Sequence, residues 1–204
     1  MSPYLRPAWA FRWLLVGLVA LGCDDAARPA GGPLPALSGP PARHGRVHFR
    51  GPERYAADLS AALEVPADAL CRELGRYDCT VTHAVTLGGI EPYRSGIYEP
   101  TVPRSASAAG ASERLALSAC EARVGRDFEA PEAALVFGPL ARGDASDEAR
   151  RAVARDLYRR LVRREASPAE VEALASLAVG SGDARDDAVG ACLALATSLE
   201  ALFY

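Results

Sequence analysis

Residues 147–164 read DEARRAVARDLYRRLVRR, and this stretch carries the clearest secondary-structure signal in the chain. Val153, Leu157 and Leu161 recur at steps of four, which is the spacing of one face of an α-helix. Most of the other positions are charged. The pattern predicts an amphipathic helix that buries its apolar face against a core.

The segments after this helix contain two further helix-start signals. Ser167, Pro168 and Glu170 fit the N-cap, the first helical position and the third helical position of a capping box. Gly180 would end that helix, and Asp183 can cap a last one. One face of the last helix would carry Val189, Cys192, Ala196, Leu199 and Phe203.

Shorter helical patterns precede residue 147. Residues 55–63 and 66–74 each predict a helix, with a break at the proline between them and a stop at Gly75. Residues 112–124 predict another helix, which Ser112 can cap and Gly125 can close. We therefore expect a fold built mainly from short, packed helices.

A different pattern occupies residues 80–87, where apolar and polar positions alternate strictly. One face would carry Val81, His83, Val85 and Leu87. This alternation predicts a strand, with His83 interpreted as a hydrogen-bonded core or edge histidine in preference to a catalytic base. Residues 88–112 are rich in turn formers, and the sequence leaves open whether they form a recognition loop or an irregular connection.

Together these patterns predict a mainly α protein. We expect a small helical bundle with a minor strand or irregular region near residues 79–100. Residues 44–204 would form this single, mostly helical domain, since a chain of that length can bury a genuine core.

The first 22 residues have the layout of a signal peptide. Arg6 and Arg12 are charged, no acid accompanies them, and residues 13–22 are then uninterruptedly apolar. Ten such residues are too few for a stable membrane span, which needs about 20. We expect this leader to be removed on export.

The leader ends in Ala20-Leu21-Gly22-Cys23, which resembles the lipobox of bacterial lipoproteins. The resemblance implies that Cys23 is lipidated and anchors the chain to a membrane of the cell envelope, facing the periplasm or the outside. Which membrane remains open, as do plain secretion after cleavage at a neighbouring bond and an uncleaved anchor. Residues 23–43 would be a tether, because residues 24–43 hold five prolines and three glycines.

Four cysteines remain once Cys23 is assigned to lipid, and an even number in an oxidising compartment favours two disulfides. Three pairings are possible. We favour Cys71 with Cys79, because Gly75 lets the chain double back between them, which leaves Cys120 with Cys192. The three histidines show no ligand spacing beside these cysteines, so we expect no metal site.

Composition excludes some partners. All 23 basic residues are arginine, which reflects a GC-rich codon choice more simply than selection for guanidinium groups, and the formal net charge is −3. This balance argues against nucleic-acid binding. The arginines of residues 147–164 could meet anionic lipid or an acidic partner, but interspersed acids favour a solvated helix face.

The C-terminal half also resembles a helical module of uncharacterised exported bacterial proteins that often accompany c-type cytochrome domains. The similarity covers residues 154–164, residues 167–171 and the closing Leu202-Phe203-Tyr204. It implies a helical fold and a possible neighbourhood, and it supplies no catalytic residues. The chain has no Cys-x-x-Cys-His motif for covalent haem.

These observations favour a non-enzymatic envelope lipoprotein that binds another protein as an accessory module, without a cofactor. The sequence contains no nucleophile elbow, zinc-protease helix, phosphate loop or calcium loop. An enzyme or electron-transfer accessory acting on an envelope substrate is the alternative, since catalytic groups can also converge from distant positions.

Overall fold

The computed structural model describes residues 48–100, 106–177 and 183–203. The predicted signal peptide, the tether, Cys23 and the helix stop at Gly180 lie outside these residues. The described part is mainly helical, as the sequence predicted, with one small antiparallel sheet that precedes the region near residues 79–100 where a strand was expected. Its helices are α1 (Pro52–Leu63), α2 (Cys79–Thr82), α3 (Ala106–Glu129), α4 (Gly138–Ala141), α5 (Asp147–Leu157), α6 (Pro168–Leu177), α7 (Ala184–Ala196) and α8 (Leu199–Leu202).

Shorter elements connect these helices. The sheet is a hairpin of β1 (Arg72–Glu73) and β2 (Tyr77–Asp78), in which Arg72 pairs with Asp78 and Glu73 with Tyr77. Single turns of 3-10 helix, η1 and η2, occupy Ala67–Ala69 and Pro131–Ala133. A π-helical turn, η3 (Tyr158–Val162), follows α5 directly.

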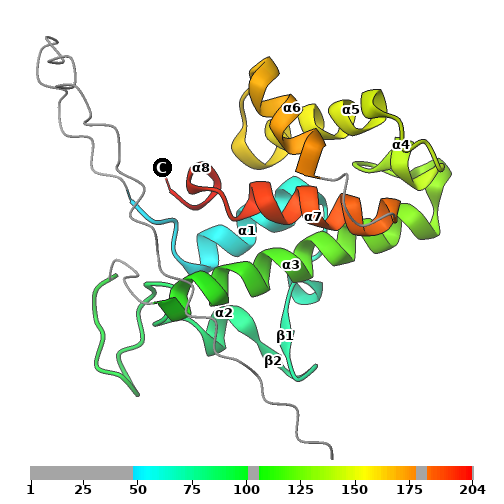
Figure 1. The fold of residues 1–204 in the computed structure, drawn as a ribbon. Helices are drawn as coiled ribbons and strands as arrows, with labels where there is room; N and C mark the ends of the chain where they lie inside the picture. The colour runs from blue at the N-terminus through cyan, green and yellow to red at the C-terminus, as the bar shows by residue number, and fades with distance from the viewer. Residues whose placement is uncertain (1–47, 101–105, 178–182, 204) are drawn as a thin grey trace, which may run out of the picture. The chain divides into compact units, whose positions relative to one another are not determined.

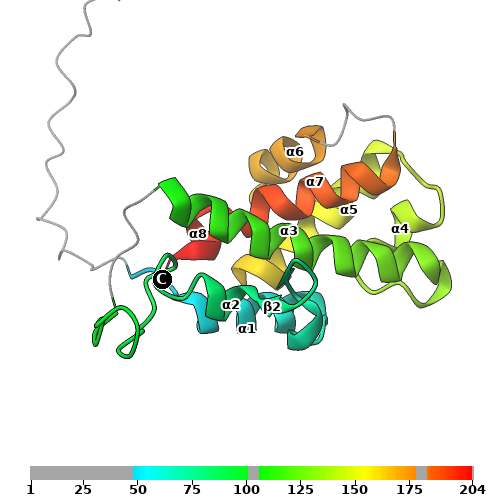
Figure 2. The ribbon, with the colours of Figure 1, turned by 90° about the horizontal axis from the view of Figure 1, so that it is seen from below.

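The core forms around α3, the longest helix. Figures 1 and 2 show α7 running alongside α3, and α3 also packs against α1, while α5 packs against α6. The largest fully buried side chains of this core come from several elements and include Tyr55, Leu59, Leu63, Leu115, Val124, Phe137 and Leu157. Burying such side chains is the main stabilising term, at roughly 25 cal/mol for each Å² of apolar surface.

Local signals located three of the helices well. In α5, Val153 and Leu157 are buried as predicted, and the helical path continues through η3, where Leu161 is buried. The capping box is confirmed, because Ser167 N donates to Glu170 Oε2 over 2.7 Å and Glu170 N donates to Ser167 Oγ over 3.3 Å. Asp183 caps α7 by accepting from Arg185 N.

The helix predicted over residues 66–74 is wrong. Only η1 is helical there, and the chain then enters the β1–β2 hairpin. Leu74 and Gly75 both adopt positive φ, of 53° and 71°, and form the hairpin turn. Gly75 therefore reverses the chain, as expected from the pairing argument, but as part of a β-turn and not as the end of a helix.

The strand predicted over residues 80–87 is also wrong. Asp78 Oδ1 accepts from Thr80 N over 2.8 Å and so caps α2, and turns follow to residue 88. Leu87 is buried, but Val81, placed on the same face by the alternation, is exposed. An isolated alternating segment has no sheet to join, so the local cap decides its conformation.

Two predicted helices have different bounds in the structure. α3 runs from Ala106 to Glu129, so that Ser112 is buried inside the helix and Gly125 does not end it. A glycine costs a helix about 1 kcal/mol, which the packing of α3 against its neighbours outweighs. The last predicted helix is divided, because Ser198 caps the separate helix α8 and leaves Leu199 exposed.

Candidate interaction surface

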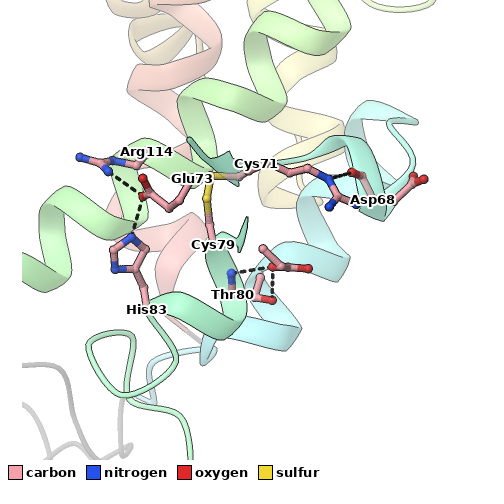
Figure 3. The surroundings of a disulfide bond; sticks show 9 residues. Asp68, Cys71, Glu73, Cys79, Thr80, His83 and Arg114 are labelled. Carbon is pink, nitrogen blue, oxygen red and sulfur yellow. Dashed lines mark hydrogen bonds and ion pairs between the residues drawn. A yellow bond between two sulfur atoms is a disulfide. The ribbon is translucent and has the colours of Figure 1, made fainter. Parts of the chain in front are cut away.

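The β1–β2 hairpin is closed by a disulfide between Cys71 and Cys79, whose Cα atoms lie 5.5 Å apart. Figure 3 shows this bond at the base of the hairpin, next to the start of α2. Cys79 N also donates to Cys71 O over 3.3 Å. The disulfide and the hydrogen bond therefore hold the two ends of the hairpin together.

A polar cluster fastens the hairpin to α2 and α3. Glu73 Oε1 lies 2.8 Å from His83 Nε2 and 2.6 Å from Arg114 Nη1 (Figure 3). The hydrogen bond from His83, followed by that from Arg114, holds the pKa of Glu73 below its usual value. His83 thus has the hydrogen-bond partner expected of a satisfied histidine, although it lies after a helix and not on a strand.

Exposed apolar side chains gather in the same part of the chain. Nine large hydrophobic side chains are exposed among the described residues, and six of them lie between residues 74 and 98. We call these six the hairpin–loop surface; they are Leu74, Tyr77, Val81, Ile90, Tyr93 and Tyr98. Leu74 is 87% exposed at the hairpin turn and Tyr93 is 95% exposed, so neither contributes to the core.

The loop that carries Tyr93 and Tyr98 has a defined internal structure. Glu91 and Ile97 form an antiparallel bridge with backbone hydrogen bonds of 3.0 Å in both directions. Inside the bridge, Glu91 Oε2 accepts from Arg94 N and Ser95 N, each over 2.7 Å. Burial would raise the pKa of Glu91, but these backbone hydrogen bonds outweigh it and lower the pKa.

The hairpin and residues 88–100 lie on the same side of the helical core. In both Figure 1 and Figure 2 they are found on the opposite side of α3 from α5 and α6. A cavity of about 490 Å³ borders the loop, lined by residues 48–53, residues 88–90 and Pro100. A second cavity, of about 190 Å³, lies beside the hairpin and includes Cys71, Asp78 and Thr80 in its lining. Of the six exposed side chains, only Ile90 lines one of these two cavities.

The second disulfide lies elsewhere, in the core. Cys120 of α3 and Cys192 of α7 are fully buried, and their Cα atoms lie 5.8 Å apart. The structure therefore contains the two pairings that we favoured from the sequence. Two disulfides are consistent with an oxidising compartment outside the cytoplasm. None of the helices in the described ranges is long and apolar enough to cross a membrane.

The arginines of residues 147–164 are engaged in ion pairs within the domain. Each of the seven has a carboxylate oxygen within 4.0 Å. Arg151, for example, reaches Glu172 of α6 over 2.9 Å. This pairing favours a solvated, ion-paired helix face, as the interspersed acids predicted.

The structure also bears on whether the chain could bind a metal ion. Within the described residues, no three His, Cys, Asp or Glu side chains come together in a way that could hold a metal ion. The sequence analysis did not single out Glu91, although a glutamate followed by the turn-forming Ser95-Gly96 was a usable signal of an ordered loop.

Comparison with protein-family models, with curated proteins and with solved structures found no match to this chain.

Proposed function

We propose that this chain is a lipoprotein of the cell envelope, lipidated at Cys23, whose helical domain binds another protein through the hairpin–loop surface. The observation that carries the proposal is the concentration of exposed apolar side chains between residues 74 and 98, three of them tyrosines. Tyrosine is enriched at protein interfaces because it offers a large apolar ring together with a hydrogen-bonding hydroxyl.

The backbone of this surface supports the same conclusion. Binding costs about 0.5–1.5 kcal/mol for each flexible side chain that it immobilises, and ordering a loop adds to that cost. Here the Cys71–Cys79 disulfide constrains the hairpin and the Glu91 hydrogen bonds constrain the loop. Leu74 and Tyr93 are therefore presented on backbone that is already ordered.

The proposed location in the cell envelope is supported by the leader sequence and by the cysteines. The lipobox-like Ala20-Leu21-Gly22-Cys23 supports lipidation, and the two disulfides support folding in an oxidising compartment. A cysteine carrying several acyl chains would hold the protein firmly, since each buried methylene contributes about 0.8 kcal/mol. The mass of the N-terminal peptide from the native protein tests this part directly, because an unmodified Cys23 would contradict it.

Site-specific photocrosslinking tests the interaction. A photoreactive phenylalanine analogue placed at Tyr93 or Leu74 of the full-length chain, in native cells, is expected to yield the same protein adduct from both positions. Leu199 is the matched control, because it is 76% exposed on α8, outside the hairpin–loop surface. Mass spectrometry then identifies the partner.

The outcomes separate the possible roles. An adduct that forms from positions 74 and 93 but not from 199 supports the proposed surface. An adduct with a c-type cytochrome would make the chain an accessory of electron transfer, which is the alternative function considered from the sequence. Equal labelling from all three positions, or none from positions 74 and 93, would contradict the proposal.

A further inference from the structure

A second feature, independent of the hairpin–loop surface, surrounds Asp58 in the middle of α1. The carboxylate of Asp58 receives three guanidinium groups. Arg50 Nη1 lies 2.6 Å from Oδ2, Arg54 Nε 3.1 Å from Oδ2 and Arg163 Nη2 2.8 Å from Oδ1. These four residues line a surface cavity of about 550 Å³.

Each guanidinium comes from a different structural position. Arg50 precedes Gly51, the N-cap of α1, while Arg54 is one helical turn before Asp58 on the same helix. Arg163 is 105 residues away in the sequence and follows η3 with a left-handed φ of 64°. A non-glycine residue adopts this conformation rarely. At Arg163 it ends η3 in a position from which the side chain reaches Asp58.

The charges of this cluster do not cancel. Three guanidiniums surround one carboxylate, which leaves a formal excess of two positive charges. The carboxylates of Glu170 and Glu200 each accept from Arg164 over 2.6 Å. Glu200 contributes only its backbone carbonyl to the cluster, 3.5 Å from Arg50 Nη2.

Donor groups also remain for a ligand. Arg54 uses only Nε and Arg163 only Nη2 in hydrogen bonds among the described residues. Their side chains are 64% and 55% exposed, so a ligand in solution can reach them. Arg50 differs, because its side chain is only 12% exposed and its two Nη groups are both engaged. Arg50 therefore fixes Asp58, and Arg54 with Arg163 offer the free donors.

We propose that Asp58, Arg50, Arg54 and Arg163 form a binding site for a phosphate group. Arginine presents paired N–H donors whose planar spacing matches two oxygens of a phosphate. Asp58 holds the guanidiniums in place and leaves Arg54 and Arg163 to contact the anion. The wholly charged lining suits a small anion and not an apolar ligand. A free phosphomonoester and a lipid headgroup share this chemistry.

Calorimetric titration of the full-length chain tests the site. The ligands are phenyl phosphate, glycerol 3-phosphate and dihexanoyl phosphatidic acid below its micelle concentration. We expect one saturable site that weakens as salt is added, and at least tenfold weaker binding by the double variant Arg54→Gln/Arg163→Gln. The double variant Arg155→Gln/Arg159→Gln is the matched control, since it removes the same charge and Arg159 is 55% exposed, like Arg163.

A second measurement does not depend on variants. In the unaltered protein, the Nε–Hε NMR signals of Arg54 and Arg163 should shift on titration with phenyl phosphate, while that of Arg155 stays in place. Equal affinity for glycerol 3-phosphate and the phosphatidic acid would identify a free phosphomonoester as the ligand. Tighter binding of the phosphatidic acid, lost in the Arg54/Arg163 variant, would identify a lipid headgroup. No saturable binding, or the same loss in both double variants, would overturn the proposal.

Discussion

The carboxylate of Asp127 lies 2.6 Å from the guanidinium of Arg123, one helical turn away in α3, and both side chains are buried. Asp127 also accepts three backbone hydrogen bonds, from the N–H groups of Leu135, Val136 and Phe137 over 2.8–3.0 Å. The end of α3 is thereby tied to the segment that leads into α4. The hydrogen bond from Phe137 N to Asp127 helps to position the side chain of Phe137, which is fully buried in the core.

Replacing Asp127 with alanine should destabilise the domain strongly. The change leaves the Arg123 charge and the N–H groups of Val136 and Phe137 buried without their acceptor, and breaking a buried ion pair typically costs about 3–5 kcal/mol. Urea unfolding followed by circular dichroism measures the loss. Glu129→Gln is the control, because this exposed carboxylate near the end of α3 should alter the free energy of unfolding by less than about 0.5 kcal/mol. A similar small change for Asp127→Ala would contradict the structural role.

The helices that the sequence located correctly have local determinants. In α5 the apolar residues Val153 and Leu157 repeat at helical spacing, and in α6 Ser167 and Glu170 cap each other. Asp183 caps the start of α7 by accepting a hydrogen bond from Arg185 N. These helices can be predicted from the sequence, because the residues of each apolar face and each cap lie within a few positions of one another.

The hairpin that replaces the predicted helix over residues 66–74, and the cluster around Asp58, depend on contacts outside the local sequence pattern. Residues 66–74 have a helical pattern, but the disulfide from Cys71 to Cys79 and the contact between Glu73 and Arg114 select a hairpin. The cluster around Asp58 needs Arg163 from 105 positions away. Contacts between distant residues leave no periodic pattern in the sequence. The candidate surface could therefore be predicted only as a turn-rich segment that contains tyrosines.

The two disulfides should differ in both accessibility and stabilisation. Cys120 and Cys192 are fully buried, whereas Cys71 is partly exposed, so mild reductant should open the Cys71–Cys79 bond first. The loop-entropy model gives about 4 kcal/mol for the 72-residue separation and about 2.5 kcal/mol for the separation of 8. Differential alkylation with mass spectrometry gives the order of reduction. Thermal unfolding of the two double-alanine variants gives the stabilities, and an inverted order in either measurement would contradict this prediction.

Acid should destabilise the domain partly through Glu170. Hydrogen bonds from Arg164, and then from Ser167, lower the pKa of Glu170 from its ordinary 4.5 to about 2. A carboxyl group with a lowered folded-state pKa stabilises the protein above its unfolded pKa, and that contribution is lost as pH falls from about 4.5 towards 2.

The variant Glu170→Gln should therefore show a shallower loss of stability over this pH range than the unaltered chain. Urea midpoints measured between pH 5 and the acid limit of folding give the comparison. Glu165→Gln removes a neighbouring exposed carboxylate without touching the Arg164–Glu170 pair, so its profile should follow that of the unaltered chain. Parallel profiles for Glu170→Gln and the unaltered chain would show that this ion pair does not contribute.

Glu91 should control the order of the loop without controlling the stability of the fold. Its carboxylate accepts from the N–H groups of Arg94 and Ser95, which directly follow the exposed Tyr93, and the loop contributes little to the core. Glu91→Ala removes the acceptor of both hydrogen bonds, so the amides of residues 94 and 95 should exchange with solvent several times faster. The free energy of unfolding should change by less than about 1 kcal/mol, because the freed N–H groups can bond to water.

The same variant links loop order to partner binding. If a preordered loop lowers the cost of association, crosslinking from position 93 should decrease in Glu91→Ala, while crosslinking from Leu74 on the disulfide-closed hairpin should decrease less. Glu99→Ala, which removes an exposed glutamate from the same loop, should leave both exchange and crosslinking unchanged. Unaltered exchange at residues 94 and 95 would contradict the role of Glu91 itself. Faster exchange with undiminished crosslinking would instead show that the partner does not require an ordered loop.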